Sequence, residues 1–359
     1  MWINTAIIWM LIFFMIIGIG DKALGNKRGY GKAFDEGFQT MGPLAIVMVG
    51  MITVAPILAE GLRPLLTPAF LWLGADPAMF SGMILAVDMG GYPLAFELAS
   101  SQEAAKFSGI ILATMLGPTF VFTVPVALGL ISNKHYPLLA RGIMLGLIPV
   151  PVGAFLGGLL AGFSPAFIGQ QLIPVFIFTG IVIVGLLLIE DIMIWCFVFI
   201  GKVMMLLVTS VLVVVAIQEL AGVTLIRGLT PFAESMEIVG LIVLALGGAF
   251  PFVHFLQRRV IPICSNIIDK SRIEAGTWIG LIASLAHSIP MYKKLDDLDN
   301  RGKLMNIAFS VSGAFVFGGH LAFTAAVEPT LVFPMIIGKL SAGILAVILA
   351  YMLSARLLR

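Results

Sequence analysis

Residues 84–93 read ILAVDMGGYP and place a carboxylate and two glycines inside a long apolar run. A charged side chain at membrane depth costs about 3 kcal/mol to insert, so by default it marks a functional site. The glycines and the following proline interrupt a helix, because glycine is flexible and proline lacks a backbone N–H. Asp88 is therefore predicted to form part of a cation site. The alternative is a structural carboxylate that accepts N–H groups freed beside Gly90 and Gly91.

The composition of the whole chain is that of an integral membrane protein. Of its 359 residues 60% are hydrophobic and only 11% are charged, whereas soluble domains carry about 25% charged residues. The net charge of +2 forms no basic stripe, so we expect no nucleic-acid partner. The two cysteines, Cys196 and Cys264, predict neither a disulfide framework nor a metal site, and we expect no cofactor.

Nine apolar runs are long enough to cross a hydrocarbon core of about 30 Å. They lie near 2–20, 42–62, 107–131, 138–162, 167–189, 192–217, 237–257, 305–325 and 332–353. The first run has no basic leader and no cleavage site, so we expect a retained helix with its N-terminus outside. Two further runs, 80–98 and 275–291, are shorter, and both contain polar residues and helix breakers.

The basic residues decide whether these two short runs cross, because cytoplasmic loops carry an excess of Lys and Arg. If both runs dip into the membrane and return, only Arg63, Lys106, Arg227 and Lys339 of the 21 basic residues lie outside. Lys339 is then expected to extend its ammonium to the interface. If every run crosses, the bias nearly vanishes. We therefore predict an all-α polytopic membrane protein with about nine transmembrane helices, two re-entrant segments and a cytoplasmic C-terminus.

The order of these features occurs twice, in 1–163 and again in 199–359, with 164–198 as a connecting helix. Five crossings separate the two starts, so the two halves are predicted to form an inverted repeat. Inverted repeats with broken helices are typical of secondary transporters, whose sites lie near the bilayer midplane. The sequence has no Walker A loop and no HExxH motif, and Asp88 with two histidines is a weak case for an intramembrane enzyme. We expect no enzymatic activity.

Three kinds of candidate site residue lie at or near the predicted interruptions: helix breakers, hydroxyl or aromatic groups, and histidines. They are Tyr92, Gly117, Pro118, Thr119, Thr123, His287, Ser288, Pro290 and His320. Freed carbonyls and helix C-termini carry partial negative charge, which suits a cationic substrate. The alternatives are that the hydroxyls bond to their own helices and that the histidines are ordinary buried residues. Elsewhere, Glu60 and Arg63 have the spacing of an interfacial ion pair.

Several stretches resemble the bacterial ethanolamine-utilisation permeases of the inner membrane. They are FDEGFQTMGPLAIVMVGM (34–51), GMILAVDMGGYPLAFELA (82–99), GPTFVFTVPVALG (117–129), SIPM (288–291), DNRGKLMNIAFSVSGAF (299–315) and FPMIIGKL (333–340). The resemblance implies uptake of ethanolamine, a small protonated amino alcohol. It also implies that Asp88, Gly90 and Gly91 form an acidic dip and that Glu36 belongs to an acidic motif through which substrate enters.

Two classes of function follow from this reading. The first is a secondary transporter that imports ethanolamine, drawn by an inside-negative potential worth about 2.3 kcal/mol per 100 mV. The second is a channel, or a carrier for another small amine, because His287-Ser288 and Gly319-His320 depart from the pattern of the resembled family. Besides the substrate, the expected partners are the lipid bilayer and, as an open alternative, further copies of the chain.

Overall fold

The structure is a computed structural model that describes the backbone of residues 2–270 and 273–357 and the side chains of 2–259 and 273–355. Every regular element of these residues is helical. Seven helical stretches are long and apolar enough to cross a membrane, which confirms an all-helical polytopic membrane protein. They are Trp2–Ala23, Tyr30–Trp72, Asn133–Leu160, Pro165–Leu188, Glu190–Ala221, Phe232–Arg259 and Pro329–Ala355. The side chain of Cys264 lies outside the described residues.

The α-helices in chain order are α1 Trp2–Ala23, α2 Tyr30–Gln39, α3 Met41–Trp72, α4 Met79–Ile84, α5 Gly91–Leu98, α6 Gln102–Lys106, α7 Val124–Leu130, α8 Tyr136–Leu147, α9 Val150–Leu160, α10 Pro165–Leu188, α11 Glu190–Ala221, α12 Phe232–Lys270, α13 Ala275–Ala286, α14 Ile289–Lys293, α15 Asn300–Ser312, α16 Gly319–Val327 and α17 Val332–Leu357. Short 3-10 helices are η1 Val87–Met89, η4 Asn133–His135, η5 Leu295–Asp297 and η6 Pro329–Leu331, and π-helices are η2 Phe107–Leu112 and η3 Thr119–Thr123.

In the first half, two apolar runs are interrupted helices. The run 80–98 consists of α4 and α5, separated by extended backbone at Leu85 and Ala86 and by η1. Gly90 has a φ of 100°, a left-handed conformation that glycine adopts without strain, and it directs the chain into α5. The run 107–131 is η2, a turn through 113–116, two helical residues at 117 and 118, and then η3 and α7. Long apolar runs thus contain real breaks.

The second half repeats this arrangement. The run 275–291 consists of α13 and α14, with extended backbone at His287 between them. Hydropathy alone predicts a membrane crossing for the run 305–325. In the structure this run consists of α15, a turn through 313–318, and α16. Each half therefore contains two interrupted helices followed by a long apolar helical stretch.

Within each half the two interruptions are hydrogen-bonded to each other. The Val87 amide donates to the Ala113 carbonyl at 3.0 Å, and the Phe315 amide donates to the Ser284 carbonyl at 2.9 Å. Irregular backbone is tolerated at membrane depth only where protein or a watery cavity satisfies its polar groups. The crossed interruptions meet this requirement by bonding to one another.

A glycine permits the close backbone approach at each crossing. A Cβ atom on Gly117 would overlap the Leu85 carbonyl oxygen, and one on Gly318 would overlap the Ala286 carbonyl oxygen. Both glycines are therefore required by packing, in the same structural place in the two halves.

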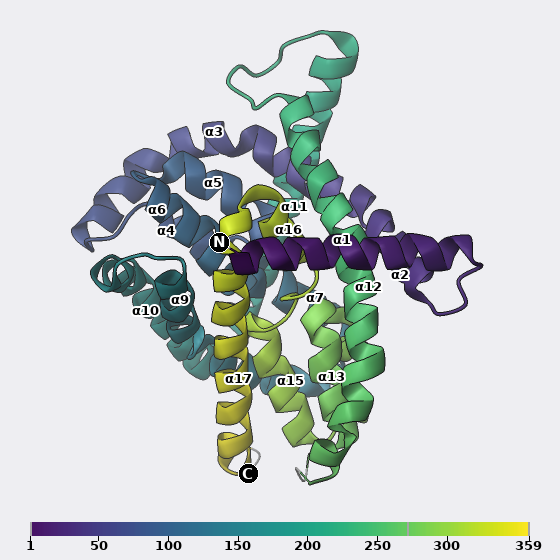
Figure 1. The fold of residues 1–359 in the computed structure, drawn as a ribbon. Helices are drawn as coiled ribbons and strands as arrows, with labels where there is room; N and C mark the ends of the chain where they lie inside the picture. Colours follow the sequence, from purple (N-terminus) through teal and green to yellow (C-terminus); the bar gives the residue numbers. More distant parts are fainter. Residues whose placement is uncertain (1, 271–272, 358–359) are drawn as a thin grey trace.

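The interrupted helices lie among long ones. Figure 1 shows α12, α13, α15 and α17 standing side by side, with α1 crossing α12. The first turn of α1 lies against the start of α17, where Asn4 donates to the Thr330 carbonyl at 2.7 Å and accepts from the Phe333 amide at 2.8 Å. Helix α3 packs on α5 and α11 along another edge of the molecule (Figure 1). All residues of η2 are buried, so the interruptions lie in the protein core.

Candidate functional site

An internal cavity of about 500 Å³, here called the central cavity, lies where the interruptions of the two halves meet. The first half contributes Asp88 and Pro118 to its lining, and the second half contributes His287, Gly319 and His320. Helices α3, α11 and α12 supply much of its apolar wall, including Leu44, Val47, Met205, Leu246 and Phe250. The fold thus brings together an acidic residue and two histidines that are far apart in sequence.

The Asp88 carboxylate faces this cavity without a close counter-ion. Its side chain is half-buried and belongs to the cavity lining. Among the described residues, no basic side chain forms an ion pair with Asp88 within 4.0 Å. A carboxylate in an apolar enclosure is costly unless a cation or hydrogen-bond donors accompany it. The arrangement therefore favours binding of a small cation in the cavity.

The two histidines present different hydrogen-bonding atoms. His287 Nδ1 accepts from the Ile289 amide at 3.2 Å, which assigns the proton of the neutral ring to Nε2 and makes that atom a donor. His320 is 3% exposed, and its Nδ1 has no hydrogen-bond partner among the described residues. The Phe315 ring lies 4.9 Å from the His287 ring and 5.3 Å from the His320 ring, between centroids. Both imidazoles are thereby held beside the cavity.

Three candidate hydroxyl groups lie next to the cavity rather than on its lining. Thr119, Thr123 and Ser288 are fully buried, and their hydroxyl oxygens have no hydrogen-bond partner among the described residues. The alternative that these hydroxyls bond to their own helices is therefore not what the structure shows. Most buried polar side chains in proteins are hydrogen-bonded. Thr119 follows the cavity-lining Pro118 and Ser288 follows the cavity-lining His287, so two of these unpartnered hydroxyls belong to residues adjacent in sequence to the lining.

Tyr92 and the glycines of the first interruption do not line the central cavity. The Tyr92 ring packs on the rings of Phe96 and Phe323, with centroids 4.4 and 5.5 Å apart. Gly90 and Gly91 shape the backbone that carries Asp88. The Tyr92 ring thus packs among aromatic side chains outside the lining of the central cavity.

A second cavity, of about 400 Å³ and here called the vestibule, adjoins the central one. Glu36 and Pro290 line the vestibule and not the central cavity. Phe250, Ala286 and His287 line both, so they form the partition between the two spaces. An acidic residue at an outer chamber and another at the inner one describe a path along which a cation could move.

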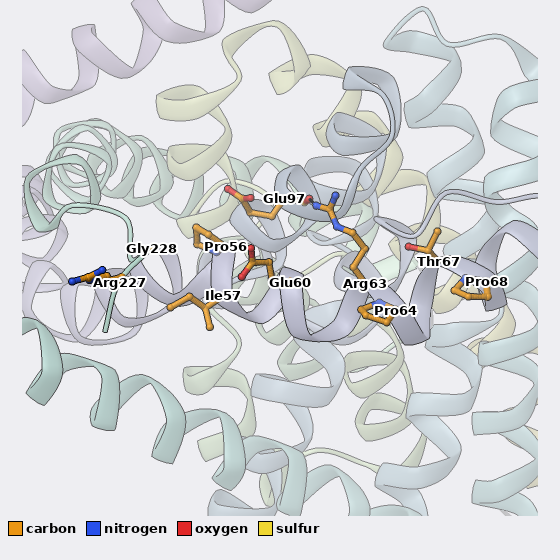
Figure 2. A pocket seen from close by; sticks show the side chains of 10 residues that line it. All are labelled: Pro56, Ile57, Glu60, Arg63, Pro64, Thr67, Pro68, Glu97, Arg227 and Gly228. Atoms are coloured by element: carbon orange, nitrogen blue, oxygen red, sulfur yellow. Dashed lines mark hydrogen bonds between the residues drawn. The ribbon is translucent and has the colours of Figure 1, made fainter. Parts of the chain in front are cut away.

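A larger cavity of about 670 Å³ lies elsewhere, along α3 (Figure 2). It is lined by two acidic and two basic residues, Glu60, Glu97, Arg63 and Arg227, so it presents no net negative charge to a cation. Arg63 Nη2 donates to the backbone carbonyl of Glu97 at 2.5 Å. The predicted Glu60–Arg63 ion pair is wrong, since the described ion pairs do not include it.

Lys339 is not at the interface, and the expectation that its ammonium reaches the membrane surface is wrong. It is 1% exposed, and Nζ donates to the Thr114 carbonyl oxygen in the turn through 113–116. The sequence carried a signal, because Lys339 stands seven residues inside the run 332–353. At 1.5 Å per helical residue this is a depth of about 10 Å.

Comparisons with known proteins agree over nearly the whole chain. The family model described as "Ethanolamine utilisation protein, EutH" matches residues 3–353. The chain is 44% identical over 360 residues to the "Probable ethanolamine permease EutH" of Listeria monocytogenes, covering 99% of this chain and 96% of that relative. It is 38% identical over 391 residues to the protein of the same name from Salmonella typhimurium, covering 98% and 96%. It is also 40% identical over 346 residues to "Uncharacterized protein YxeR" of Bacillus subtilis, covering 96% and 94%. No solved structure matches the chain significantly.

Proposed function

The chain belongs to the EutH family of ethanolamine utilisation proteins, which are permeases and not enzymes, and from that premise we propose that it imports protonated ethanolamine through the central cavity. The observation that carries this proposal is the Asp88 carboxylate, which faces a largely apolar cavity without a close counter-ion. Ethanolamine at neutral pH is an ammonium with a hydroxyl two carbons away. The site needs one negative group and one hydroxyl partner, and the cavity lining offers both.

In the proposed complex the ammonium lies against Asp88, as a charge-assisted hydrogen bond requires. The hydroxyl is close to His287 Nε2 or to His320. Phe122, which also lines the cavity, offers a ring face worth about 1–2 kcal/mol to a cation. The unpartnered hydroxyls of Thr119, Thr123 and Ser288 form a polar layer outside the lining, which bound water would connect to the ligand.

Basic residues support an orientation in a bacterial inner membrane with the vestibule toward the cytoplasm. His254 of the vestibule contacts the Arg28 carbonyl through Nε2 at 3.0 Å, and Arg258 donates to the same carbonyl at 3.0 Å. Basic residues at a membrane face favour the cytoplasmic side. In a variant that lacks Cys196 and Cys264, Glu36→Cys should react with an impermeant thiol reagent from the cytoplasm. Faster reaction from outside would reverse this orientation.

An ion pair joins the two halves at the far side of the interrupted helices. Lys106 Nζ and Glu328 Oε2 are 3.0 Å apart, and both side chains are largely buried. We infer that this pair closes the central cavity toward the outside while the vestibule stays accessible. Exchange of access between the two sides around one site is the expected behaviour of a carrier built from two repeats.

Reciprocal packing supports the inverted repeat with halves 1–163 and 199–359, connector 164–198, nine crossings and two re-entrant segments. A Cβ atom on Gly50 of α3 would overlap Val208 of α11, and one on Gly248 of α12 would overlap Leu11 of α1. A long helix of each half therefore packs on the first helix of the other half. A pseudo-two-fold axis produces such an exchange.

The test is uptake of labelled ethanolamine into proteoliposomes that hold purified protein and an inside-negative potential. We expect saturable uptake, acceleration by unlabelled ethanolamine inside (counterflow), and weaker competition by choline and simple alkylamines than by amino alcohols. Linear uptake without counterflow would support the channel alternative. If another amine competed more strongly than ethanolamine, that amine would become the proposed substrate, and the protein would still be assigned as a carrier.

A further inference from the structure

A buried lysine joins the second half of the chain to the interruption of the first half. Lys339 lies in α17, and its Nζ donates to the Thr114 carbonyl in the turn that interrupts 107–131. The ammonium is thus held at a backbone oxygen of the first half's interruption, yet Lys339 is not part of the central-cavity lining.

The charge of this ammonium acts on Asp88. The crossing of the two interruptions brings these groups near each other, because Lys339 bonds to Thr114 while the neighbouring Ala113 carbonyl accepts from Val87, the residue before Asp88. The two charges do not form an ion pair among the described residues, but they interact electrostatically. An ammonium and a carboxylate that are largely removed from water are each costly alone, and each lowers the cost of the other. Asp88 therefore keeps its cavity-facing side free for substrate, while Lys339 balances its charge from behind.

No such lysine is seen at the interruption of the second half among the described residues. The helix that takes the place of α17 in the first half is α8, and it presents Gly142 and Gly146 to α15, where they pack on Ile307 and Val311. Among the described residues a buried lysine therefore reaches the interruption of the first half, which holds the carboxylate, and none reaches the interruption of the second half.

We propose that Lys339 is a built-in counter-cation, whose ammonium occupies the position beside Asp88 that a soluble coupling ion such as Na⁺ could otherwise take. This inference rests on the proposed function and deepens it. Carbonyls of unwound helices and a nearby carboxylate are the ligands with which transporters of repeated architecture bind Na⁺. An ammonium can donate hydrogen bonds to the oxygens that would otherwise bind Na⁺, so the Lys339 ammonium already fills that position. The substrate is then the only ion that binds during a transport cycle.

The proposal predicts how transport depends on ions. Wild-type uptake of ethanolamine should be equal in Na⁺, K⁺ and N-methylglucamine media at one membrane potential. Lys339→Ala should lower uptake by about tenfold or more in N-methylglucamine, because the carboxylate is left uncompensated. Na⁺ should restore part of that uptake by entering the vacated space. A requirement for Na⁺ in the wild-type protein would overturn the proposal, as would a Lys339→Ala variant that transports normally in every medium.

Thermal melting of the purified proteins without ethanolamine gives a readout independent of transport. Na⁺ should raise the melting temperature of Lys339→Ala and leave that of the wild type unchanged. The double variant D88N/K339M should melt above K339M alone, because it removes both charges. Lys303→Met is the matched control, since Lys303 is also buried but its charge acts on His135 and Asp296. It should gain no response to cations.

The two failures are distinguishable. If the wild type does not take up ethanolamine, the proposed substrate is lost, and the melting experiments still decide the role of Lys339. If the wild type transports ethanolamine but K339A gains no cation response and D88N/K339M melts no higher than K339M, Lys339 is a structural residue and the counter-cation is wrong.

Discussion

The two interrupted regions share one backbone plan and differ in charge. In each half, crossed interruptions bond to one another and a glycine lies over a carbonyl oxygen, at Gly117 and at Gly318. The first region carries Asp88 and receives Lys339, whereas the second offers the neutral polar groups of His287 and Ser288. We therefore expect the shared backbone plan to form the frame of the cavity and the charge of the first region to supply its affinity for a cation.

The charge on the first region should produce the largest effect on transport. Asp88→Asn keeps the shape of the side chain and removes its charge, so we expect ethanolamine affinity to fall by about 100-fold, or about 3 kcal/mol. Uptake by proteoliposomes and the melting temperature should be measured together. Glu60→Gln is the control, because Glu60 lines the charge-balanced cavity of Figure 2 and should be dispensable. Normal uptake by Asp88→Asn would remove the carboxylate from the site.

The shared backbone plan should appear as equal effects in the two halves. Gly117→Ala and Gly318→Ala each force a Cβ atom onto a carbonyl oxygen, so each should destabilise the protein by about 1–3 kcal/mol. Melting temperature and folded yield in detergent are the measurements.

Neighbouring glycines with open space provide the controls for this pair. Gly129→Ala and Gly319→Ala meet nothing within 4 Å and should be tolerated. If Gly117→Ala were costly and Gly318→Ala harmless, the two crossings would not be equivalent.

Sequence patterns predicted the interruptions better than they predicted the contacts between them. Glycines, prolines and Asp88 predict local helix interruptions, because their backbone preferences do not depend on the rest of the fold. The run 305–325 was predicted as a crossing since its hydropathy allows one, and its turn is stabilised by the Phe315–Ser284 hydrogen bond. A hydropathy profile cannot predict a backbone hydrogen bond between two segments that are distant in sequence.

The candidate site was predicted in its residue types and only partly in its geometry. Asp88, His287 and His320 do meet at one cavity, whereas Tyr92 does not line it and packs on Phe96. The partner of Lys339 lies 225 residues away in sequence, so no local pattern could identify it. The unpartnered state of Thr119 and Thr123 depends on a π-helix, which has no sequence signal in this chain.

The neutral groups of the second region should produce a smaller effect on transport than the charge of the first. His287→Phe retains an aromatic ring and removes the Nε2 donor, so we expect the KM for ethanolamine to rise about fivefold, the value of one neutral hydrogen bond of about 1 kcal/mol. The maximal rate should change little. If ethylamine, which lacks the hydroxyl, lost affinity equally in this variant, His287 would not be the hydroxyl partner.

The smallest effect is expected where the first half meets the second outside the membrane core. Asp296 Oδ2 accepts from the Ser132 hydroxyl at 2.9 Å, and this hydrogen bond lowers the pKa of the Asp296 carboxyl below its usual range. A carboxyl with a lowered folded-state pKa contributes stability above its unfolded pKa and loses that contribution as pH falls through the folded value. Ser132→Ala should therefore melt slightly below the wild type at pH 7, and the two curves should converge as the carboxyl is protonated. If the difference in melting temperature stayed constant as the pH was lowered, the lost stability would come from packing of η4 and not from the carboxylate. The contact between the halves would then not depend on the charge of Asp296.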